Sequence, residues 1–271
     1  MLRVIPAPAD LLELIAGCVI IDAPAALTCT HFPADVGSML IVRTAGHVQR
    51  EQGSDTTPIE LPRGALVGAS TRPTRFIHEG AVSAIGLILK PQVVPCLLRD
   101  TPAGLVDRAF AASDLLGPEW SRTEQALHLA HFDDARSRIL FDFVRRSVAR
   151  PRDQDRRLRI QRMTSAVSAG IGLACDELAM SRRQLERRFV IEVGMTPKRF
   201  QTIVRMSNAL RRSASASRAG AQIAIDAGYF DQSHMARDLR RLAGDRLTRL
   251  APRNRERLHE YWPVEAGLLL A

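Results

Sequence analysis

The chain has 271 residues, of which 46% are hydrophobic and 25% are charged. This length allows about two domains, and the composition excludes a disordered or low-complexity chain. Residues 1–150 hold 15 basic and 16 acidic side chains, a net charge of −1, whereas residues 151–271 hold 23 and 13, a net charge of +10. The second region therefore attracts an anionic partner such as nucleic acid or an acidic surface.

The cysteines and the apolar runs indicate the compartment. The four cysteines are Cys18, Cys29, Cys96 and Cys175. Their spacing fits neither a metal site nor a disulfide framework, which favours a reducing environment. The apolar run over residues 11–21 is interrupted by Glu13, is stopped by Asp22 and Pro24 and is too short to span a bilayer, and the sequence shows no signal-peptide pattern. We therefore expect a cytoplasmic protein with no membrane partner.

The first region predicts a β-rich domain. A short helix is expected over residues 8–18. Short apolar runs between Gly- and Pro-containing turns predict strands at residues 39–42, 65–67 and 84–89. Helix is expected again over 91–98 and over 124–148, where apolar residues recur at helical spacing, and the second of these leads into a linker around 150–155.

Histidines and cysteines in this region are candidates for chemistry. A metal site would use His31, His47 and His78, but these residues lack the clustered His/Glu spacing that a metal needs, so no metal is predicted. Cys18 and Cys96 are candidate redox sensors, although a buried inert cysteine is the more common role.

Basic residues could also serve an anionic ligand. The candidates are Arg72, Arg75 and Lys90, and the competing interpretation is solvated charge at the ends of strands. No motif combines a nucleophile, a base and an orienting group, so neither a catalytic residue nor a cofactor is predicted.

The second region contains one short segment twice, fifty positions apart. Residues 181–189 read SRRQLERRF and residues 231–239 read DQSHMARDL. Ser181 and Asp231 can each cap a helix, and Ser181 with Gln184 fits a capping box. Apolar residues four apart anchor each helix on one face, namely Leu185 with Phe189 and Met235 with Leu239.

Another face of each copy carries polar side chains suited to DNA. The candidates for base reading are Arg182, Arg183, Glu186 and Arg187 in the first copy and Gln232, Ser233, His234 and Arg237 in the second. Such side chains match the donor and acceptor pattern of a major groove, into which a helix-turn-helix inserts the N-terminus of its second helix. Supporting helices are predicted at 173–178 and 222–227. Ordinary amphipathic helices with solvated arginines are the alternative for one copy alone, and the duplication argues against it.

Residues from about 160 to 252 resemble the DNA-binding region of AraC/XylS-type transcriptional regulators. The resemblance is carried by SRRQLERRF, by VGMTPKRF at residues 193–200 and by AGYFDQSHMARDLRRLAG at residues 227–244. It implies two helix-turn-helix units joined by one long helix, here from Pro197 to about Ser213. ELPRGALVGASTRP and AIGLILKP are similar to the amino-terminal sensory domains of some of these regulators, which implies a cupin-like or small-barrel fold over about residues 5–120.

Three residues depart from the family pattern. Ala179 stands where the first turn usually has glycine, so we expect some strain there, because alanine adopts a left-handed backbone less readily. Leu247 stands where a second glycine-x-x-proline often occurs. Glu186 is unusual beside phosphates; it can accept a hydrogen bond from cytosine N4 or orient Arg182 or Arg183, and we favour orientation.

Together these features predict an α+β chain that binds double-stranded DNA as a transcriptional regulator. The predicted divisions are a β-rich sensory or dimerisation domain (1–122), a helical linker (123–155), a double helix-turn-helix domain (156–255) and a tail (256–271). The resemblance further implies a small-molecule effector, a homodimer and contact with RNA polymerase. The alternatives are a cupin-type enzyme or DNA-repair protein with an appended DNA-binding domain, and a non-specific architectural protein.

Overall fold

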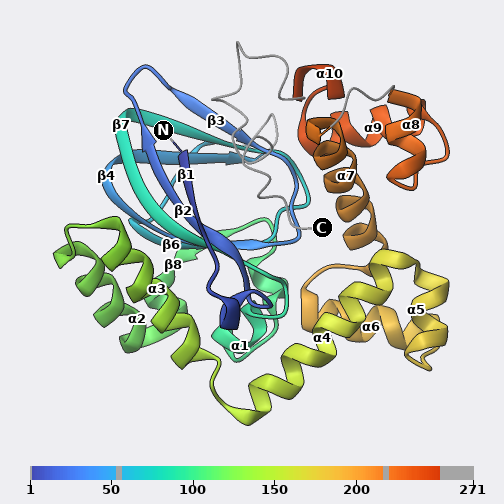
Figure 1. Cartoon of the computed structure of the whole chain (residues 1–271), viewed down its shortest axis with the longest axis horizontal. Helices are drawn as coiled ribbons and strands as arrows, with labels where there is room; N and C mark the ends of the chain where they lie inside the picture. Colours follow the sequence, from blue (N-terminus) through green and yellow to red (C-terminus); the bar gives the residue numbers. More distant parts are fainter. Residues whose placement is uncertain (1, 53–56, 216–219, 251–271) are drawn as a thin grey trace.

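The computed structural model describes residues 2–52, 57–215 and 220–250. It places a β-rich part before a helical part, as predicted (Figure 1). The strands are β1 (Leu2–Pro6), β2 (Ile15–Ala23), β3 (Cys29–Phe32), β4 (Ser38–Gln52), β5 (Ile59–Glu60), β6 (Gly64–Val67), β7 (Thr74–Leu89) and β8 (Ala109–Ala111). The helices around them are the 3₁₀ turns η1 (Ala9–Leu11) and η2 (Pro102–Leu105), and α1 (Val94–Leu98), α2 (Ala112–Leu129) and α3 (Asp133–Ser147).

The described strands form one antiparallel sheet in the order β1-β2-β7-β4-β6-β8, with β3 paired to β7 and β5 paired to β4. β4 and β7 run side by side over most of their length, and their register shifts on either side of Ala45. Bulges of this kind bend a strand and increase its twist. The sheet is accordingly strongly curved (Figure 1).

Successive side chains of a strand point to opposite faces of the sheet. In this sheet the side chains on both faces are buried. Leu40 and Val42 of β4 belong to a core with α2 and α3, in which the rings of Trp120 and Phe143 pack edge to face 5.1 Å apart. Ile41 belongs to a second apolar cluster on the concave side. Burial on both faces explains why the strands read as continuous apolar runs.

Two local predictions for this part are wrong. Residues 8–18 contain only the short turn η1 before β2 begins, because Ile15 and the residues after it pair with both β1 and β7. The helix predicted over 124–148 is two helices, α2 and α3, with non-helical residues 130–132 between them. Residues 150–155, predicted as the end of a helical linker, lie mostly within α4 (Pro151–Ala169), where Pro151 stands at a position that favours the start of a helix.

The predicted domain boundaries fall inside helices. Residue 122 lies within α2 and residue 155 within α4. Since α2 and α3 share the core of the sheet, we propose that the amino-terminal unit extends to about residue 148, whose valine still belongs to that core. The predicted tail, 256–271, lies outside the described residues.

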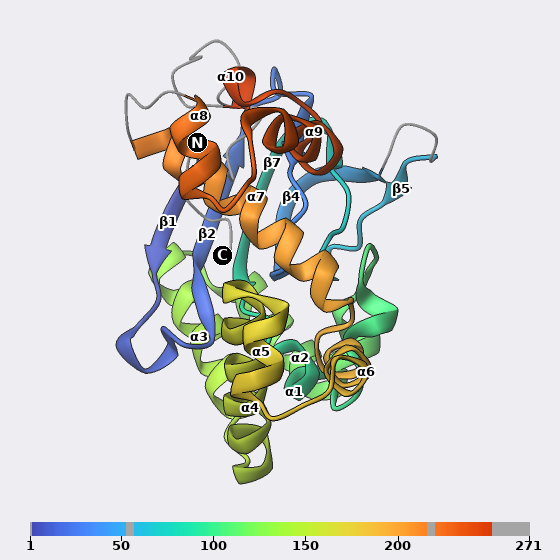
Figure 2. The same ribbon diagram turned by 90° about the vertical axis from the view of Figure 1, so that its right-hand side faces the viewer.

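The helical part consists of α4, α5 (Ile171–Glu177), α6 (Arg182–Val193), α7 (Pro197–Ser215), α8 (Gly220–Asp226), α9 (Gln232–Ala243) and α10 (Leu247–Leu250). One apolar core runs through all of them. α7 connects the α5–α6 pair to the α8–α9 pair, so the two predicted helix-turn-helix units and their long joining helix are present (Figure 2).

Candidate nucleic-acid interface

The amino-terminal end of each candidate recognition helix is capped. Ser181 Oγ accepts a hydrogen bond from the backbone N–H of Gln184 at 3.3 Å, and Gln184 Oε1 accepts one from the N–H of Ser181 at 2.9 Å. Asp231 Oδ1 accepts from the N–H of His234 at 2.6 Å. These bonds satisfy backbone donors that a helix start leaves unpaired, so α6 and α9 begin at defined residues.

The opposite sides of α6 differ sharply in burial. Leu185 and Phe189 are fully buried, and the Phe189 ring packs edge to face on Phe200 of α7 at 5.2 Å. The four predicted reading residues, Arg182, Arg183, Glu186 and Arg187, are all exposed. The structure therefore brings these four side chains to one open surface.

The same division holds for α9, with one exception. Met235 and Leu239 are buried, while Gln232, Ser233 and Arg237 are exposed. His234 is only partly exposed, because its ring packs edge to face on Tyr229 at 5.1 Å and its Nε2 lies 3.9 Å from a carboxylate oxygen of Asp238. Sequence reasoning missed Asp238, which is buried and also accepts a hydrogen bond from Arg241 at 2.7 Å.

The turn before each recognition helix follows one hydrogen-bonding pattern. In the first turn the N–H of Met180 donates to the carbonyl of Cys175, and in the second the N–H of Tyr229 donates to the carbonyl of Ala224, both at 2.9 Å. Ala179 has a positive φ of 50°, as the departure from glycine predicts, where Gly228 has 81°. A left-handed residue with this bond is a common helix ending, and the alanine bears the steric cost.

The second turn is one residue longer than the first. Met180 directly precedes the cap Ser181, whereas Tyr229 is followed by Phe230 before the cap Asp231. Tyr229 takes the inward position and is buried, with Arg205 of α7 over its ring at 5.3 Å. The additional residue, Phe230, is 91% exposed. Sequence reasoning placed Phe230 in the turn, but its exposure follows from the extra residue and not from any motif.

The predicted role of Glu186 in orienting an arginine stays a prediction. Among the described residues no ion pair joins its carboxylate to Arg182 or Arg183, and all three side chains are exposed. At this exposure the gain from an arginine–carboxylate pair is small compared with the side-chain entropy that it costs.

Comparison with known families decides the nature of this region. Residues 174–252 match the family model described as a helix-turn-helix domain. This segment is an AraC-type helix-turn-helix domain. The prediction of a helix-turn-helix domain is thereby confirmed for these residues.

Comparison with solved structures finds similar chains at low sequence identity. ToxT from Vibrio cholerae strain SCE256, bound to an unsaturated fatty acid, is 11% identical, with 85% of this chain and 92% of that chain covered and a TM-score of 0.48. The AraC-like transcriptional activator CuxR is 15% identical, with 69% and 79% covered and a TM-score of 0.27. No curated protein sequence matches the chain.

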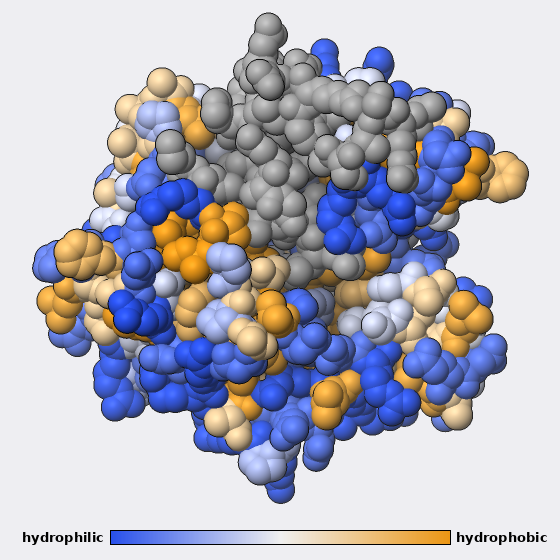
Figure 3. Space-filling model, in the orientation of Figure 1, coloured by the Kyte–Doolittle hydropathy of each residue, from blue (hydrophilic) through white to orange (hydrophobic). Residues whose placement is uncertain are grey.

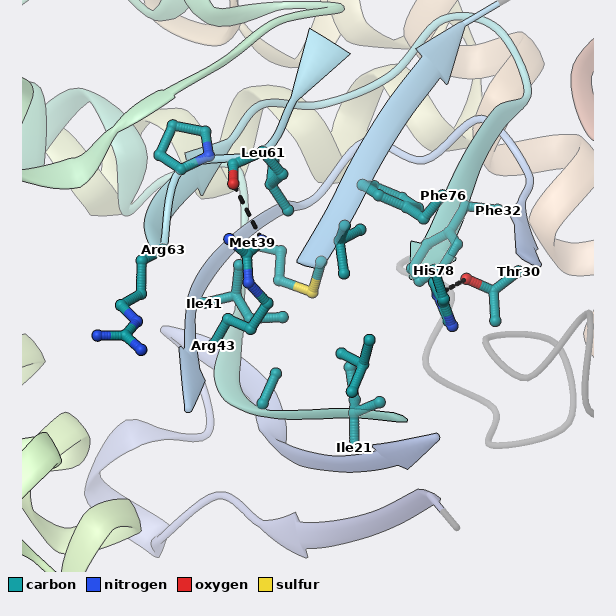
Figure 4. Close-up of a pocket in the computed structure, with 14 residues that line it drawn as sticks. Ile21, Thr30, Phe32, Met39, Ile41, Arg43, Leu61, Arg63, Phe76 and His78 are labelled. Atoms are coloured by element: carbon teal, nitrogen blue, oxygen red, sulfur yellow. Dashed lines mark hydrogen bonds between the residues drawn. The ribbon is translucent and has the colours of Figure 1, made fainter. Parts of the chain in front are cut away.

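The amino-terminal unit that accompanies the AraC-type domain contains a small apolar hollow of about 40 Å³ on the concave side of its sheet. Apolar side chains such as Met39, Ile41 and Phe76 line most of it (Figure 4). On the face seen in Figure 3, apolar side chains gather over the curved sheet, whereas the surface over α3 and α4 is mostly hydrophilic.

Arg43 and His78 are among the polar side chains at this hollow, and they reach it from different sides (Figure 4). Arg43 is buried and donates to the Leu61 carbonyl at 3.0 Å, and its nearest carboxylate, Glu60, is 4.0 Å away. His78 lies 3.2 Å from the hydroxyl of Thr30, and burial lowers the pKa of its imidazole. Burial also lowers the pKa of Arg43, which nevertheless remains a cation. Sequence reasoning did not single out Arg43.

The structure does not bring the three candidate histidines together. His31 lies beside Cys29, with 3.6 Å between ring nitrogen and sulfur, and His47 lies 3.7 Å from Glu60. His78 faces Thr30 instead. Over residues 2–52, 57–215 and 220–250, no group of three His, Cys, Asp or Glu side chains is arranged to hold a metal.

The candidate redox cysteines and the candidate anion-binding residues of this unit do not have the surroundings that these roles need. Burial raises the pKa of Cys18 to about 12 and that of Cys96 to about 11, so both thiols stay protonated at neutral pH. Arg75 forms an ion pair with Glu51 at 2.7 Å. Arg72 and Lys90 flank opposite ends of β7, so the three basic residues form no common site.

None of the described helices is long and apolar enough to cross a bilayer.

Proposed function

We propose that this protein is a sequence-specific transcriptional regulator that places α6 and α9 in successive major-groove segments of double-stranded DNA. The observation that supports this most directly is the exposure of both polar faces at capped helix starts, on helices whose other faces share one core. A shared core fixes the positions of the two helices relative to each other. Successive major-groove segments on one side of DNA lie about one helical turn apart, which is the spacing that the two helices would have to match.

The two faces offer different contacts. We assign guanine or phosphate to Arg187 and Arg237, because a guanidinium matches both. Gln232 and Ser233 are uncharged donors and acceptors for base edges, while the contacts of His234 limit its freedom to reach a base. Arg182 and Arg183 are assigned to the backbone or to guanine, and Glu186 to cytosine N4.

Phe230 adds an apolar contact at the start of α9. Its ring is 91% exposed and stands one residue before the cap of a DNA-reading helix. An apolar side chain at a groove is complementary to the methyl group of thymine. We therefore assign Phe230 to a thymine near the α9 half-site.

The hollow in the amino-terminal unit is the proposed effector site. Its walls are mostly apolar, and the buried Arg43 has its carboxylate partner, Glu60, only at 4.0 Å. A buried cation is stabilised by an anionic partner, so the chemistry of this lining favours an apolar acid. Homodimerisation, contact with RNA polymerase and cytoplasmic location stay predictions. The enzyme alternative receives no support from the surroundings of the histidines and cysteines.

Selection of bound sequences from a random DNA pool, with the full-length protein near physiological salt, tests the DNA-binding proposal. We expect enrichment of two short blocks about one turn apart. Binding without enrichment would favour the architectural alternative, because backbone contacts alone carry no sequence preference.

A matched ligand pair tests the effector site. Octanoate and octan-1-ol share an apolar chain and differ in the charged head, so thermal stabilisation by octanoate alone is the expected result. Arg43→Met should remove that stabilisation. An equal response of both proteins to octanoate would exclude Arg43 as the anion partner.

A further inference from the structure

The amino-terminal unit contacts both recognition helices at the same place, their carboxy-terminal ends. At α6, an added Cβ on the cap residue Gly194 would lie 2.9 Å from Val106 Cγ2 and 3.1 Å from the Pro102 carbonyl oxygen. At α9, an added Cβ on the cap residue Gly244 would lie 3.6 Å from Pro73. The two glycines are equivalent positions of the repeat, with φ of 87° and 81°.

Polar contacts reinforce both attachments. The Ala34 N–H donates to the carbonyl of Leu242 at 2.6 Å, which satisfies one of the acceptors that the last turn of α9 leaves unpaired. At the other end, Arg156 donates to Glu192 in the last turn of α6 at 2.7 Å and to the Pro95 carbonyl of the amino-terminal unit at 2.8 Å. Ala34, Val36 and Ala69 also belong to the core of the helical part.

Asp107 connects the segment at α6 to the segment at α9. Its two carboxylate oxygens accept from the N–H and the hydroxyl of Thr71, both at 2.6 Å, and Gln52 donates to one of them at 2.7 Å. The Asp107 N–H donates to the carbonyl of Ala69 at 2.9 Å. Asp107 has a positive φ of 61°, a conformation that aspartate tolerates better than most residues and that persists where surrounding contacts enforce it.

The path is completed by a backbone bridge. Asp35 and Ser70 exchange two hydrogen bonds between backbone N–H and carbonyl groups, of 3.0 and 2.9 Å. These bonds join the loop of Ala34, which contacts α9, to the loop of Thr71, which bonds to Asp107. We call residues 34–35, 69–73 and 102–107 the strut. It leads from the end of α9 to the end of α6 without passing through α7, and it leaves the exposed polar faces of both helices uncovered.

We propose that the strut fixes the orientation of α9 relative to α6 and thereby sets the spacing between half-sites that the protein accepts. The proposal rests on the DNA-binding function proposed above. Asp107 acts as a positioning residue, because it touches no DNA-facing side chain. Phe32 lines the apolar hollow and lies two residues before Ala34, so the wall of the hollow continues directly into the strut.

The test uses the full-length protein and duplexes in which the two selected half-sites are moved apart or together one base pair at a time. Wild-type affinity should fall steeply away from the selected spacing. For Asp107→Ala the preference for that spacing should weaken by about fivefold or more, the lower range of coupling between sites. Asp114→Ala is the control, since it removes the same charge from an exposed position of α2 and should keep the wild-type preference.

Two outcomes separate failure of the strut from failure of the proposed function. A wild-type protein that selects no two-block sequence contradicts the proposed function itself. A folded Asp107→Ala protein that keeps the wild-type preference overturns the strut alone. If Asp107→Ala does not fold, Thr71→Val decides, because it removes one hydroxyl donor to Asp107 and should weaken the preference in the same direction.

Discussion

The two helix-turn-helix units have one backbone plan and different surfaces. Arginines dominate the first reading face, beside the single carboxylate of Glu186, and none of these side chains is braced within the described structure. The second face has the uncharged Gln232 and Ser233, a packed His234 and the additional Phe230. The comparison shows that a duplicated scaffold keeps caps and core while the polar faces of the two copies differ, and we expect backbone attraction to dominate at the first face and discrimination at the second.

The largest expected effect tests whether the two units are one structure. Phe189→Ala removes a buried ring from the core that both units share, and it should lower the free energy of unfolding by about 3–5 kcal/mol. The denaturant midpoints measured at the two helix-turn-helix units should fall by the same amount. Leu173→Ala is the control, since its side chain is 62% exposed and a change within about 0.5 kcal/mol is expected. Separate unfolding transitions for the two units would show that they do not form one cooperative structure.

Arginines at equivalent positions test the division between discrimination and attraction. Arg237→Ala should cost about 1–3 kcal/mol on the selected sequence and much less on random DNA, as a base contact requires. Arg187→Ala should weaken binding to both DNAs and reduce the salt dependence, because its face supplies mainly charge. Fluorescence anisotropy at several salt concentrations measures both. Equal losses on the two DNAs for Arg237→Ala would assign that residue to phosphate instead.

Phe230 sharpens the comparison, because the first turn has no equivalent residue. Phe230→Ala should weaken binding to the selected sequence by about 1 kcal/mol, because that is about the free energy of exposing one methyl-sized apolar group to water. The loss should disappear on a duplex in which uracil replaces the contacted thymine. Because the ring is exposed, the melting temperature should not change. An identical loss on the thymine and uracil duplexes would exclude the methyl contact.

The smallest effect concerns the left-handed residue of each turn. A non-glycine residue in the left-handed conformation destabilises the folded state by about 1–2 kcal/mol. Glycine instead favours the unfolded state by about 0.4–1 kcal/mol through its larger backbone entropy, so the net difference is smaller. Ala179→Gly should therefore stabilise the protein, and Gly228→Ala should destabilise it, each by about 0.5–1 kcal/mol. Thermal unfolding of the two variants measures these changes. Shifts of the same sign would show that the turns are not equivalent.

Much of the helical half could be read from the sequence, because its signals are local. Caps, apolar residues four apart and the repeat itself act within a few turns of chain, so α6 and α9 were predicted close to their observed positions, while the bounds of α7 came from the family resemblance. The first half was predicted only as β-rich. Its strand pairings join residues far apart in the chain, and the apolar run that became β2 carries no periodicity that separates strand from helix.

The sequence by itself determined the fold class, the duplicated DNA-reading helices and the residues on their faces. Only the tertiary structure decided that Arg43 enters an apolar hollow, that Phe230 extends into solvent, and that Asp107 joins the two loops that contact the ends of the recognition helices. The physical reason is the range of the interactions. Capping and helical periodicity depend on residues three or four apart, whereas a hollow and a strut depend on which distant segments the curved sheet brings together.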